Sequence, residues 1–543
     1  MSISFTATLA FVLATPHVAD LEWNRMLLSI PYNILDSQNA TVRQFIEDRA
    51  AWGSMIAAIA ALVTYISAWR KAPLLEPFIQ PDPADPHMYR DEVARIELLK
   101  TFRHEAGSKT KRGLWLAPHL ALPFGLEPRN IMILGAAGSG KSNLVRALAQ
   151  QAIERGDRVV LHCHKGDVAG CFDPKDIILI NPAHRDGWAV DIGADIDGPA
   201  AAFEFACDII PRSDQPFWSD SARLIVADAI NALARQKGAN WGARALLLSL
   251  LNDPDTLRRQ IKAIDLSASP LLGSGDEDGI DKTVRGIIST ILSGALTTLR
   301  PMAYAWSALP PQKRFSVKRW LADDYNGPRI VIVQTSPEFP ELSTSVCGGV
   351  LRAICKRLAG AAVPIDHNRR VYFILDEFYA MGRVERLAEA LSVAREKGLV
   401  VIAALQSVFQ VQINYPDEKD LMSDLFQIKI FSRLVAGPGA NDAQERMGSR
   451  TIQWQDKNRT PTADDTRKVI MKEEKKPVFS AAQLQRDVGL FEANSPKEFV
   501  RAVIHYAAAV YQLDWPPTKW TAQRAGFVAA KWTKFIKPAK AAS

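Results

Sequence analysis

Two long uncharged runs stand out near the start of the chain. Residues 2–19 and 50–69 contain no Asp, Glu, Lys or Arg, and a helix that crosses a membrane needs about 20 mostly apolar residues. Aromatic residues lie near the ends of the second run, where they favour the headgroup region, and Arg70 and Lys71 follow it directly. The pattern predicts a transmembrane helical hairpin, residues 1–71, with the rest of the chain in the cytoplasm.

Each run has an alternative interpretation. A cleaved signal peptide could account for residues 2–19, but no Lys or Arg precedes that apolar run. A buried core helix could account for residues 50–69, although the run has the length of a membrane span. Five prolines between positions 73 and 86 then indicate a stiff linker.

Further along, the apolar pattern changes from strand to helix around a glycine-rich loop. "NIMIL" (130–134) has the continuous apolar character of a buried parallel strand, and residues 142–156 have apolar positions at helical spacing up to Gly156. The loop between them matches the phosphate-binding pattern G-x-x-x-x-G-K-[ST]. We therefore expect nucleotide phosphates to bind at Gly135, Ala136, Ala137, Gly138, Ser139, Gly140, Lys141 and Ser142.

Each chemical group of that pattern has a physical role. Backbone N–H groups and the following helix N-terminus attract the phosphates, and Lys141 adds a positive charge at the β- and γ-phosphates. The hydroxyl group of Ser142 is suited to bind Mg²⁺. The sequence thus predicts ATP and Mg²⁺ as cofactors. A glycine turn followed by a chance Lys-Ser pair is the alternative.

Two later apolar runs end in polar residues that fit the same chemistry. "VYFIL" (371–375) leads into Asp376 and Glu377, and we expect Asp376 to hold Mg²⁺ through water and Glu377 to polarise the attacking water. An acidic helix cap after a strand is the alternative. A further run, 399–405, ends in Gln406, which could contact the γ-phosphate or the water. Together these patterns predict an α/β ATPase core with a parallel sheet.

The stretch between these motifs has a different pattern. From about residue 200 to 306 the apolar residues fall at helical spacing, and strand-like runs resume only at 329–335. Residues 282–320, which overlap the end of this stretch, contain seven basic and no acidic residues. Such a strip suits contacts with a nucleic-acid backbone, although a solvated surface is an equally simple explanation.

Composition narrows the class of protein only slightly. The chain has 543 residues, enough for two or three domains, and 66 Lys and Arg against 59 Asp and Glu, a net charge of +7. This mild excess permits a nucleic-acid partner without requiring one. Five cysteines are too few and odd in number for a disulfide framework, which fits a reducing compartment.

The order of these motifs resembles the type IV coupling proteins of bacterial conjugation, the TraD/TraG-type family. The stretches that carry the resemblance are "GAAGSGKS" (135–142), "RGDRVVLHCHKGD" (155–167), "ILINPAHRDGWAVD" (178–191), "QPFWSDSARLIVADAI" (215–230), "FILDEF" (373–378) and "AREKGLVVIAALQS" (394–407). Members of this family are membrane-anchored, RecA-like hexameric ATPases that link a DNA–relaxase substrate to a type IV secretion channel.

The resemblance implies a RecA-like P-loop NTPase with an inserted all-α domain and an N-terminal transmembrane helical hairpin. It implies these segments: membrane anchor 1–71, linker 72–110, nucleotide-binding domain 111–195 and 326–515, all-α domain 196–325, and basic C-terminal tail 516–543. The tail carries six basic and no acidic residues from Lys519 onwards and lacks the long acidic extension of some members.

The resemblance also implies an activity, partners and further site residues. We expect an inner-membrane coupling ATPase that works as a homohexamer with DNA, relaxase and channel components, and we expect Lys165 and Asp167 near the nucleotide. In the family, the position of Arg395 carries an arginine finger, and the all-α domain contacts DNA. The expected catalytic residues are Glu377, Arg395 and Gln406, and the expected DNA contacts are Lys282, Arg285, Arg300, Lys313 and Arg314.

Other functions remain open at this point. A protein-effector receptor of a secretion system would use the same ATPase core without DNA. An FtsK-type DNA translocase usually carries a separate winged-helix module at its C-terminus, and the last forty residues contain none that we recognise. A non-enzymatic membrane scaffold fits poorly with the paired phosphate and carboxylate motifs. A metal site in "LHCHKGDVAGC" (161–171) is disfavoured, because successive side chains of a strand face opposite ways.

Overall fold

A computed structural model describes residues 52–53, 55–64, 85–107, 110–273, 282–307, 309–336, 338–384, 387–455 and 471–534. The chain forms two compact units, of which the smaller comprises residues 1–80 and 452–474. Of the predicted hairpin, residues 1–71, only 52–53 and 55–64 are described, and they are helical. Within the described residues, no helix combines the length and the apolar character that a membrane span requires.

A mixed sheet organises the larger unit. The eleven strands found in the described residues are, in order across the sheet, β1 (His87–Arg90), β17 (Ala509–Trp515), β16 (Phe499–Tyr506), β12 (Ile428–Phe431), β4 (Ile131–Leu134), β11 (Leu399–Leu405), β10 (Val371–Leu375), β5 (Arg158–Cys163), β9 (Ile330–Gln334) and β6 (Ile177–Ile180), with β15 (Gly489–Phe491) beside β16. The strands from β12 to β6 all run parallel.

The parallel strands confirm the predicted α/β class. Every residue of β4, β10 and β11 is buried, as expected for strands that are covered on both faces. The sequence prediction did not distinguish the other side of the sheet, where β16 pairs antiparallel with β12 and β17. The sheet is therefore mixed rather than purely parallel.

Helices cover both faces of the sheet. On one face lie α4 (Asp91–Ala106) and α5 (Lys141–Glu154), which bury Leu98 and Leu148 against the sheet. On the other face lie α13 (Pro340–Ala359) and α14 (Leu387–Val393), which bury Leu351 and Leu391. Further elements are β2 (Arg112–Ala117), β3 (Leu120–Pro123), α6 (Ile192–Asp195), α12 (Val317–Leu321), α15 (Phe409–Asn414), α16 (Lys419–Asp424), α17 (Pro438–Met447), β13 (Ser449–Gln455), β14 (Met471–Pro477) and α18 (Ala481–Arg486).

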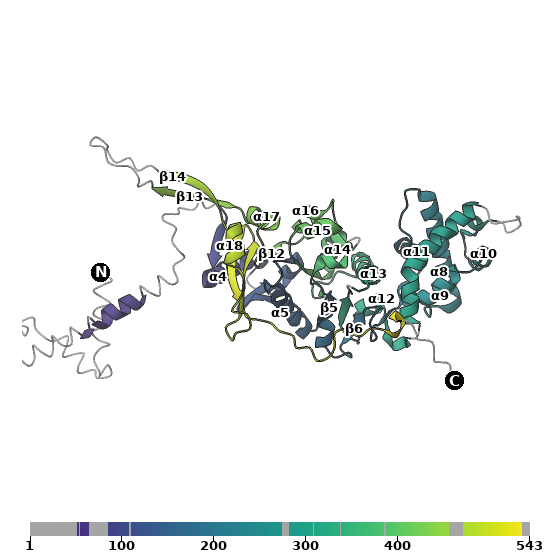
Figure 1. Cartoon of the computed structure of the whole chain (residues 1–543), viewed down its shortest axis with the longest axis horizontal. Coiled ribbons are helices and arrows are strands. Elements are labelled where there is room, and N and C mark those ends of the chain that lie inside the picture. The colour runs from purple at the N-terminus through teal and green to yellow at the C-terminus, as the bar shows by residue number, and fades with distance from the viewer. Residues whose placement is uncertain are drawn as a thin grey trace, which may run out of the picture. The chain divides into compact units, whose positions relative to one another are not determined.

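A helical bundle interrupts the sheet-forming sequence between β6 and β9. Its helices are α7 (Pro199–Ile209), α8 (Pro216–Lys237), α9 (Ala243–Leu250), α10 (Pro254–Lys262) and α11 (Lys282–Trp306). They enclose a core of their own, which includes Ile230, Leu246 and Ile291, and they stand together at one end of the larger unit (Figure 1). The chain enters and leaves this region through two short paired strands, β7 (Ala189–Val190) and β8 (Arg314–Phe315).

The C-terminal segment runs across the part of the larger unit that contains the sheet and reaches the helical bundle (Figure 1). We call residues 516–534 the strap, which Figure 1 shows as a long yellow segment that leaves β17 and ends in a short helical turn near α11. Val528 and Ala530 form backbone hydrogen bonds with the segment 183–185. Gly526 lies against Gly166, and the ring of Trp532 stacks on Tyr304 of α11 with centroids 6.4 Å apart. The strap thus contacts both parts of the larger unit.

Replacement of Gly526 by alanine is expected to detach the strap. The new Cβ would lie 1.8 Å from the carbonyl oxygen of Gly166, and this backbone atom cannot move away as a flexible side chain could. We expect a destabilisation of about 1–3 kcal/mol, as for other overpacked sites, and faster tryptic cleavage after Arg524 and Lys531. Gly125→Ala is the control, because nothing lies within 4 Å of its new Cβ. Equal cleavage rates in the two variants would contradict this view of the strap.

Candidate nucleotide-binding site

The polar ends of three adjacent strands meet at one edge of the sheet. β4 leads into the loop 135–140, β11 leads into Gln406 and β10 leads into Asp376. Because β11 pairs with both β4 and β10 in parallel, their carboxyl ends lie side by side. Ligands of open α/β sheets bind outside such carboxyl ends. Segments that are up to 271 positions apart in sequence therefore share one site.

The glycine-rich loop has a backbone that requires glycine at defined positions. Gly138 and Gly140 have φ values of +71° and +91°, a region that glycine adopts without steric penalty. At Gly135, a Cβ would lie 2.5 Å from Ser139 Oγ and 3.1 Å from Lys141 Cγ. The loop can therefore close around its own residues only when position 135 has no side chain.

Lys141 and Ser139 present polar groups inside this loop. Lys141 Nζ donates hydrogen bonds to the carbonyl oxygens of Gly135, at 2.5 Å, and Ala136, at 2.9 Å. Burial lowers the pKa of Lys141, and Asp376 and Glu377 oppose this shift. The hydroxyl of Ser139 is fully buried and has no hydrogen-bond partner within the described residues. A loop with an inward ammonium group and a free buried hydroxyl is suited to bind an anion.

Ser142 and Asp376 approach each other across the site. Ser142 lies in the first turn of α5, and its hydroxyl donates to Asp376 Oδ2 at 3.3 Å. Burial, followed by the neighbouring charge of Glu377, raises the pKa of Asp376, while Ser142 and Lys141 act in the opposite direction. Hydroxyl and carboxylate oxygens are the ligands that Mg²⁺ prefers. The pair thus fits the predicted metal position.

Glu377 lies next to this pair in an uncommon backbone conformation. Its φ and ψ are 55° and 52°, the left-handed region, which costs a residue with a side chain about 1–2 kcal/mol. Its Oε1 is 3.1 Å from Lys165 Nζ, and this hydrogen bond raises the pKa of Lys165. Such strain often occurs at functional sites. Lys165 therefore lies beside Glu377, and its expected place near a nucleotide stays a prediction.

Asp167 and His162, which belong to the same sequence segment as Lys165, contact other residues. Asp167 pairs with Arg146 at 2.9 Å and accepts a weak hydrogen bond from Cys163. His162 is buried, and its ring contacts the backbone carbonyl of Asp376. Burial lowers the pKa of His162 to about 4, so its ring is neutral near pH 7. The sequence singled out this segment but predicted no role for His162.

The strand β12 supports the phosphate loop, a feature that sequence reasoning missed. Ser432 Oγ donates to the carbonyl of Ser139 at 2.6 Å, and Arg433 Nη2 donates to the carbonyl of Gly138 at 3.3 Å. The backbone of Arg433 also accepts a hydrogen bond from Ala136 N. A polar Ser-Arg pair directly after a buried strand was the available signal. It gave no indication that this strand neighbours β4.

Two other predicted catalytic residues are exposed. Gln406 directly follows β11, and its backbone N–H donates to Gln410 Oε1 at 2.8 Å. Arg395 lies in the short 3-10 helix η7 (Ala394–Lys397). Within the described residues, the Arg395 side chain makes no hydrogen bond or ion pair. Both roles remain predictions.

The basic strip is divided between two environments. Lys282, Arg285 and Arg300 are exposed on α11, whereas Arg314 donates to Asn240 Oδ1 at 3.3 Å. Lys313 lies beyond α11 and is partly buried. The strip's last two basic residues, Lys318 and Arg319, pair with Asp197 and Asp191 from another segment. Among the residues that the structure describes, the basic residues of the strip that are exposed and make no ion pair are therefore those of α11, and a phosphate backbone attracts positive charge of this kind.

Comparisons with known proteins agree with this arrangement. The family model described as "Type IV secretion-system coupling protein DNA-binding domain" matches residues 115–487. A curated relative, "Coupling protein TraD" of Escherichia coli (strain K12), is 25% identical over 332 residues, which are 60% of this chain and 44% of that protein. The chain thus spans less than half the length of this relative.

Solved structures of the conjugative coupling protein TrwB have the same fold. TrwBdeltaN70 in complex with sulphate has a TM-score of 0.62 at 19% identity and covers 84% of this chain and 99% of its own. TrwB in complex with ADP and Mg²⁺ has a TM-score of 0.58 at 18% identity and covers 79% of this chain and 94% of its own. These likenesses confirm the predicted RecA-like α/β fold. Because the family model spans well over half of the sequence, the chain belongs to the family of type IV secretion-system coupling proteins that this DNA-binding domain defines.

Proposed function

We propose that this chain is a coupling ATPase that drives DNA transfer through a type IV secretion channel. The observation that carries the proposal is the convergence of Lys141, Ser142, Asp376 and Glu377 at one sheet edge, with Ser142 Oγ 3.3 Å from Asp376 Oδ2. Among the structural relatives, TrwB is described in complex with ADP and Mg²⁺ and with a non-hydrolysable ATP analogue. ATP and Mg²⁺ are therefore the cofactors that we assign to this site.

Each residue of the site has a role that follows from its position. The loop N–H groups and Lys141 bind the phosphates of ATP, and Ser142 and Asp376 would hold Mg²⁺. A bound Mg²⁺ supplies positive charge that stabilises the transferred phosphoryl group. Glu377, paired with Lys165, polarises the attacking water as a general base. Gln406, at the end of the strand between the two motifs, contacts the γ-phosphate or that water.

The work that hydrolysis drives is inferred from the family. The matching model is that of a coupling-protein DNA-binding domain, and the curated relative is named a coupling protein. We infer that the chain assembles as a homohexamer, binds DNA mostly without sequence preference, and receives its substrate from relaxase proteins. The resemblance covers only part of the curated relative, so these partners are proposals for this chain.

We further propose that the chain is anchored in the bacterial inner membrane by a helical hairpin within residues 1–71. The described helical residues of this region carry large apolar side chains that are exposed, which include Trp52, Ile59, Leu62 and Val63. Exposed apolar side chains on one helix suit a lipid environment better than water. The bulk of the chain, which follows Arg70 and Lys71, would then lie in the cytoplasm.

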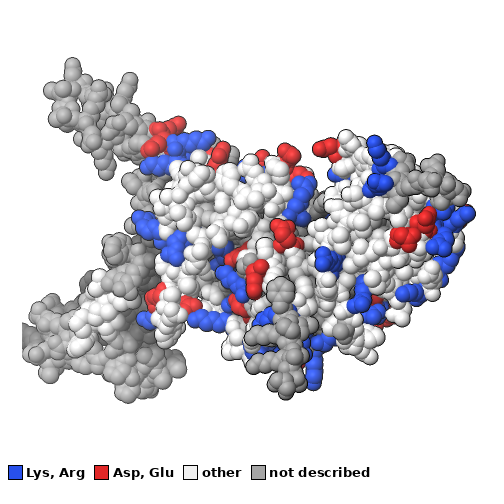
Figure 2. Space-filling model, turned by 45° about the vertical axis from the view of Figure 1, so that its right-hand side comes forward, with Lys and Arg blue, Asp and Glu red and all other residues white. Residues whose placement is uncertain are grey.

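The exposed side of α11 supports a DNA contact. Arg285, Ser289, Ser293, Thr297 and Arg300 are exposed along this helix, at spacings that bring them to one side of it. Arginine side chains and the hydroxyl groups of serine and threonine both bind backbone phosphates. Figure 2 shows Lys and Arg side chains over this end of the molecule, separated by acidic and uncharged surface. The contact would thus be local rather than a broad basic field.

Replacement of both Arg285 and Arg300 by glutamine is expected to weaken DNA binding equally for all DNA sequences. Each lost phosphate contact should reduce the slope of log affinity against log salt by about 0.9 for duplex DNA and about 0.7 for single strands. Binding titrations at several salt concentrations measure this slope. Lys318→Gln with Arg319→Gln is the control, because it removes the same charge from residues that already pair with acidic groups. If the slope is unchanged in both variants, α11 does not contact DNA.

ATP hydrolysis by the full chain in detergent, measured with and without DNA, tests the proposed function. We expect hydrolysis that requires Mg²⁺ and becomes several-fold faster with DNA of any sequence. Lys141→Ala is the control for contaminating ATPases, because it removes the positive charge from the phosphate loop. Absence of hydrolysis would refute the ATPase assignment, and hydrolysis that no DNA accelerates would refute the DNA-coupled function alone.

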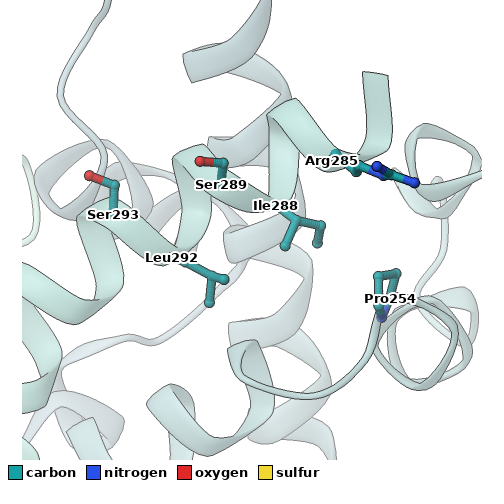
Figure 3. A pocket seen from close by; sticks show the side chains of 6 residues that line it. All are labelled: Pro254, Arg285, Ile288, Ser289, Leu292 and Ser293. Atoms are coloured by element: carbon teal, nitrogen blue, oxygen red, sulfur yellow. The ribbon is translucent and has the colours of Figure 1, made fainter. Parts of the chain in front are cut away.

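One feature of the helical bundle favours a second candidate, a receptor for protein substrates. A pocket of about 450 Å³ is lined by Pro254, Arg285, Ile288, Ser289, Leu292 and Ser293. Figure 3 shows Ile288 and Leu292 on one side of α11, with Arg285 beside Pro254 at one end. Apolar side chains next to a single cation suit an acidic amphipathic segment of a protein. Hydrolysis that a secreted protein accelerates, and DNA does not, would favour this candidate.

A further inference from the structure

His162 is a buried polar residue at the edge of the site that the roles above leave unused. It lies near the end of β5, whose register pairs it with Leu375 of β10 and Val333 of β9. Alternation along the strands places His162 on the face of the sheet covered by α13, and Asp376 on the face covered by α5. The carboxylate of Asp376 faces Ser142 of α5. Its backbone carbonyl is the group that His162 reaches.

The contacts of His162 form a chain of hydrogen bonds with one direction. His162 Nδ1 is 2.7 Å from the carbonyl oxygen of Asp376, and Nε2 is 3.2 Å from Thr335 Oγ1. A carbonyl oxygen only accepts, so Nδ1 carries the hydrogen, and in a neutral ring Nε2 then accepts from the hydroxyl of Thr335. Thr335 has a single hydrogen to donate and therefore accepts from His164 Nδ1, which is 3.0 Å away. The order is His164, Thr335, His162, Asp376.

The last bond of this chain holds the peptide unit that carries Glu377. The carbonyl of Asp376 belongs to the amide plane that precedes Glu377, whose φ of +55° is the strained feature of the site. The orientation of that plane relative to the Glu377 side chain is set by φ. A donor fixed in the core of the sheet therefore restrains this φ, and with it the direction in which the carboxylate points.

We propose that His162 is a positioning residue that holds the Asp376–Glu377 peptide in the orientation required for hydrolysis. The proposal rests on the ATPase function inferred above and adds a residue to it. His162 touches neither the phosphate loop nor the Glu377 side chain in the contacts described, so its loss should not remove a nucleotide contact. It should instead displace the general base, and a displacement of about 1 Å can slow an enzyme on the order of 10²-fold.

Two substitutions of nearly equal size separate this role from simple packing. In His162→Asn, the side-chain amide nitrogen occupies the place of Nδ1 and can still donate to the Asp376 carbonyl. In His162→Leu, a methyl group occupies that place and cannot donate. We expect the leucine variant to lose about 10- to 100-fold in kcat, with KM for ATP changed less than about threefold, and the asparagine variant to retain kcat within about threefold of wild type.

Full-length variants in detergent are compared in Mg²⁺-dependent ATP hydrolysis, in binding of a fluorescent ATP analogue and in thermal unfolding. Equal kcat in the leucine variant and the wild type, or equal losses in both variants, would overturn the proposal. If His162→Leu does not fold, Thr335→Val and Thr335→Ser are compared instead. Valine removes the hydroxyl that donates to His162 Nε2, whereas serine keeps it. Equal kcat values in these two variants would also overturn the proposal. A wild-type chain without hydrolysis refutes the ATPase function itself, whereas failure of the variants alone refutes only this role of His162.

Discussion

A Glu377→Gln variant is expected to bind ATP with nearly unchanged affinity and to hydrolyse it about 10²- to 10⁴-fold more slowly than the wild type. The amide has the size of the carboxylate but cannot accept a proton from the attacking water. Lys141, Ser142 and Asp376, which bind the phosphates and Mg²⁺ in the proposed site, are untouched by the change. Binding of a fluorescent ATP analogue and the steady-state rate of phosphate release measure the two effects separately.

The substitution also removes the ion pair with Lys165, so a matched control is needed. Lys165→Met removes the same ion pair and keeps the carboxylate. We expect it to reduce the rate far less than Glu377→Gln, because the Lys165 side chain is 69% exposed and such pairs contribute at most about 1 kcal/mol. Comparable losses in the two variants would show that the ion pair, rather than proton acceptance by Glu377, limits the reaction.

The parts of the site that could be predicted from the sequence are local in the chain. The loop between β4 and α5 is one continuous segment, and its glycines are required by backbone conformations that depend only on nearby residues, such as φ of +91° at Gly140. Asp376 and Glu377 directly follow the strand β10, which is fully buried and therefore continuously apolar in sequence. In both cases a short pattern contains the physical reason for its own structure.

The features that the sequence did not reveal depend on contacts between distant segments. Residues 282–320 contain no acidic residue, yet Arg319 pairs with Asp191, more than 100 positions earlier. The strap lies within the segment whose composition predicts only a basic tail, and nothing in that composition indicates that Gly526 lies against Gly166. Similarly, the bond between His162 and Asp376 requires β5 to neighbour β10, and strand order is a property of the whole fold.

Arg395→Ala is expected to reduce ATP hydrolysis on the order of 10³-fold or more. An arginine from a neighbouring subunit can cancel charge that develops on the γ-phosphate, so that hydrolysis depends on assembly. The Arg395 side chain is exposed and has no hydrogen bond or ion pair within the described residues, which leaves it available to another copy of the chain. Glu396→Ala, in the same turn, is the control and should retain the wild-type rate.

A mixing experiment tests whether Arg395 acts between subunits. Lys141→Ala subunits keep the arginine but cannot use ATP, and Arg395→Ala subunits keep the phosphate site but lack the arginine. If the arginine acts across the interface, each Arg395→Ala site beside a Lys141→Ala subunit regains a complete set of groups. Mixed assemblies should then hydrolyse ATP although neither variant does so alone. Tagged subunits purified in two steps show whether the assemblies are mixed. Inactive assemblies that contain both variants, or an Arg395→Ala chain with near wild-type activity, would exclude an intersubunit role for this residue.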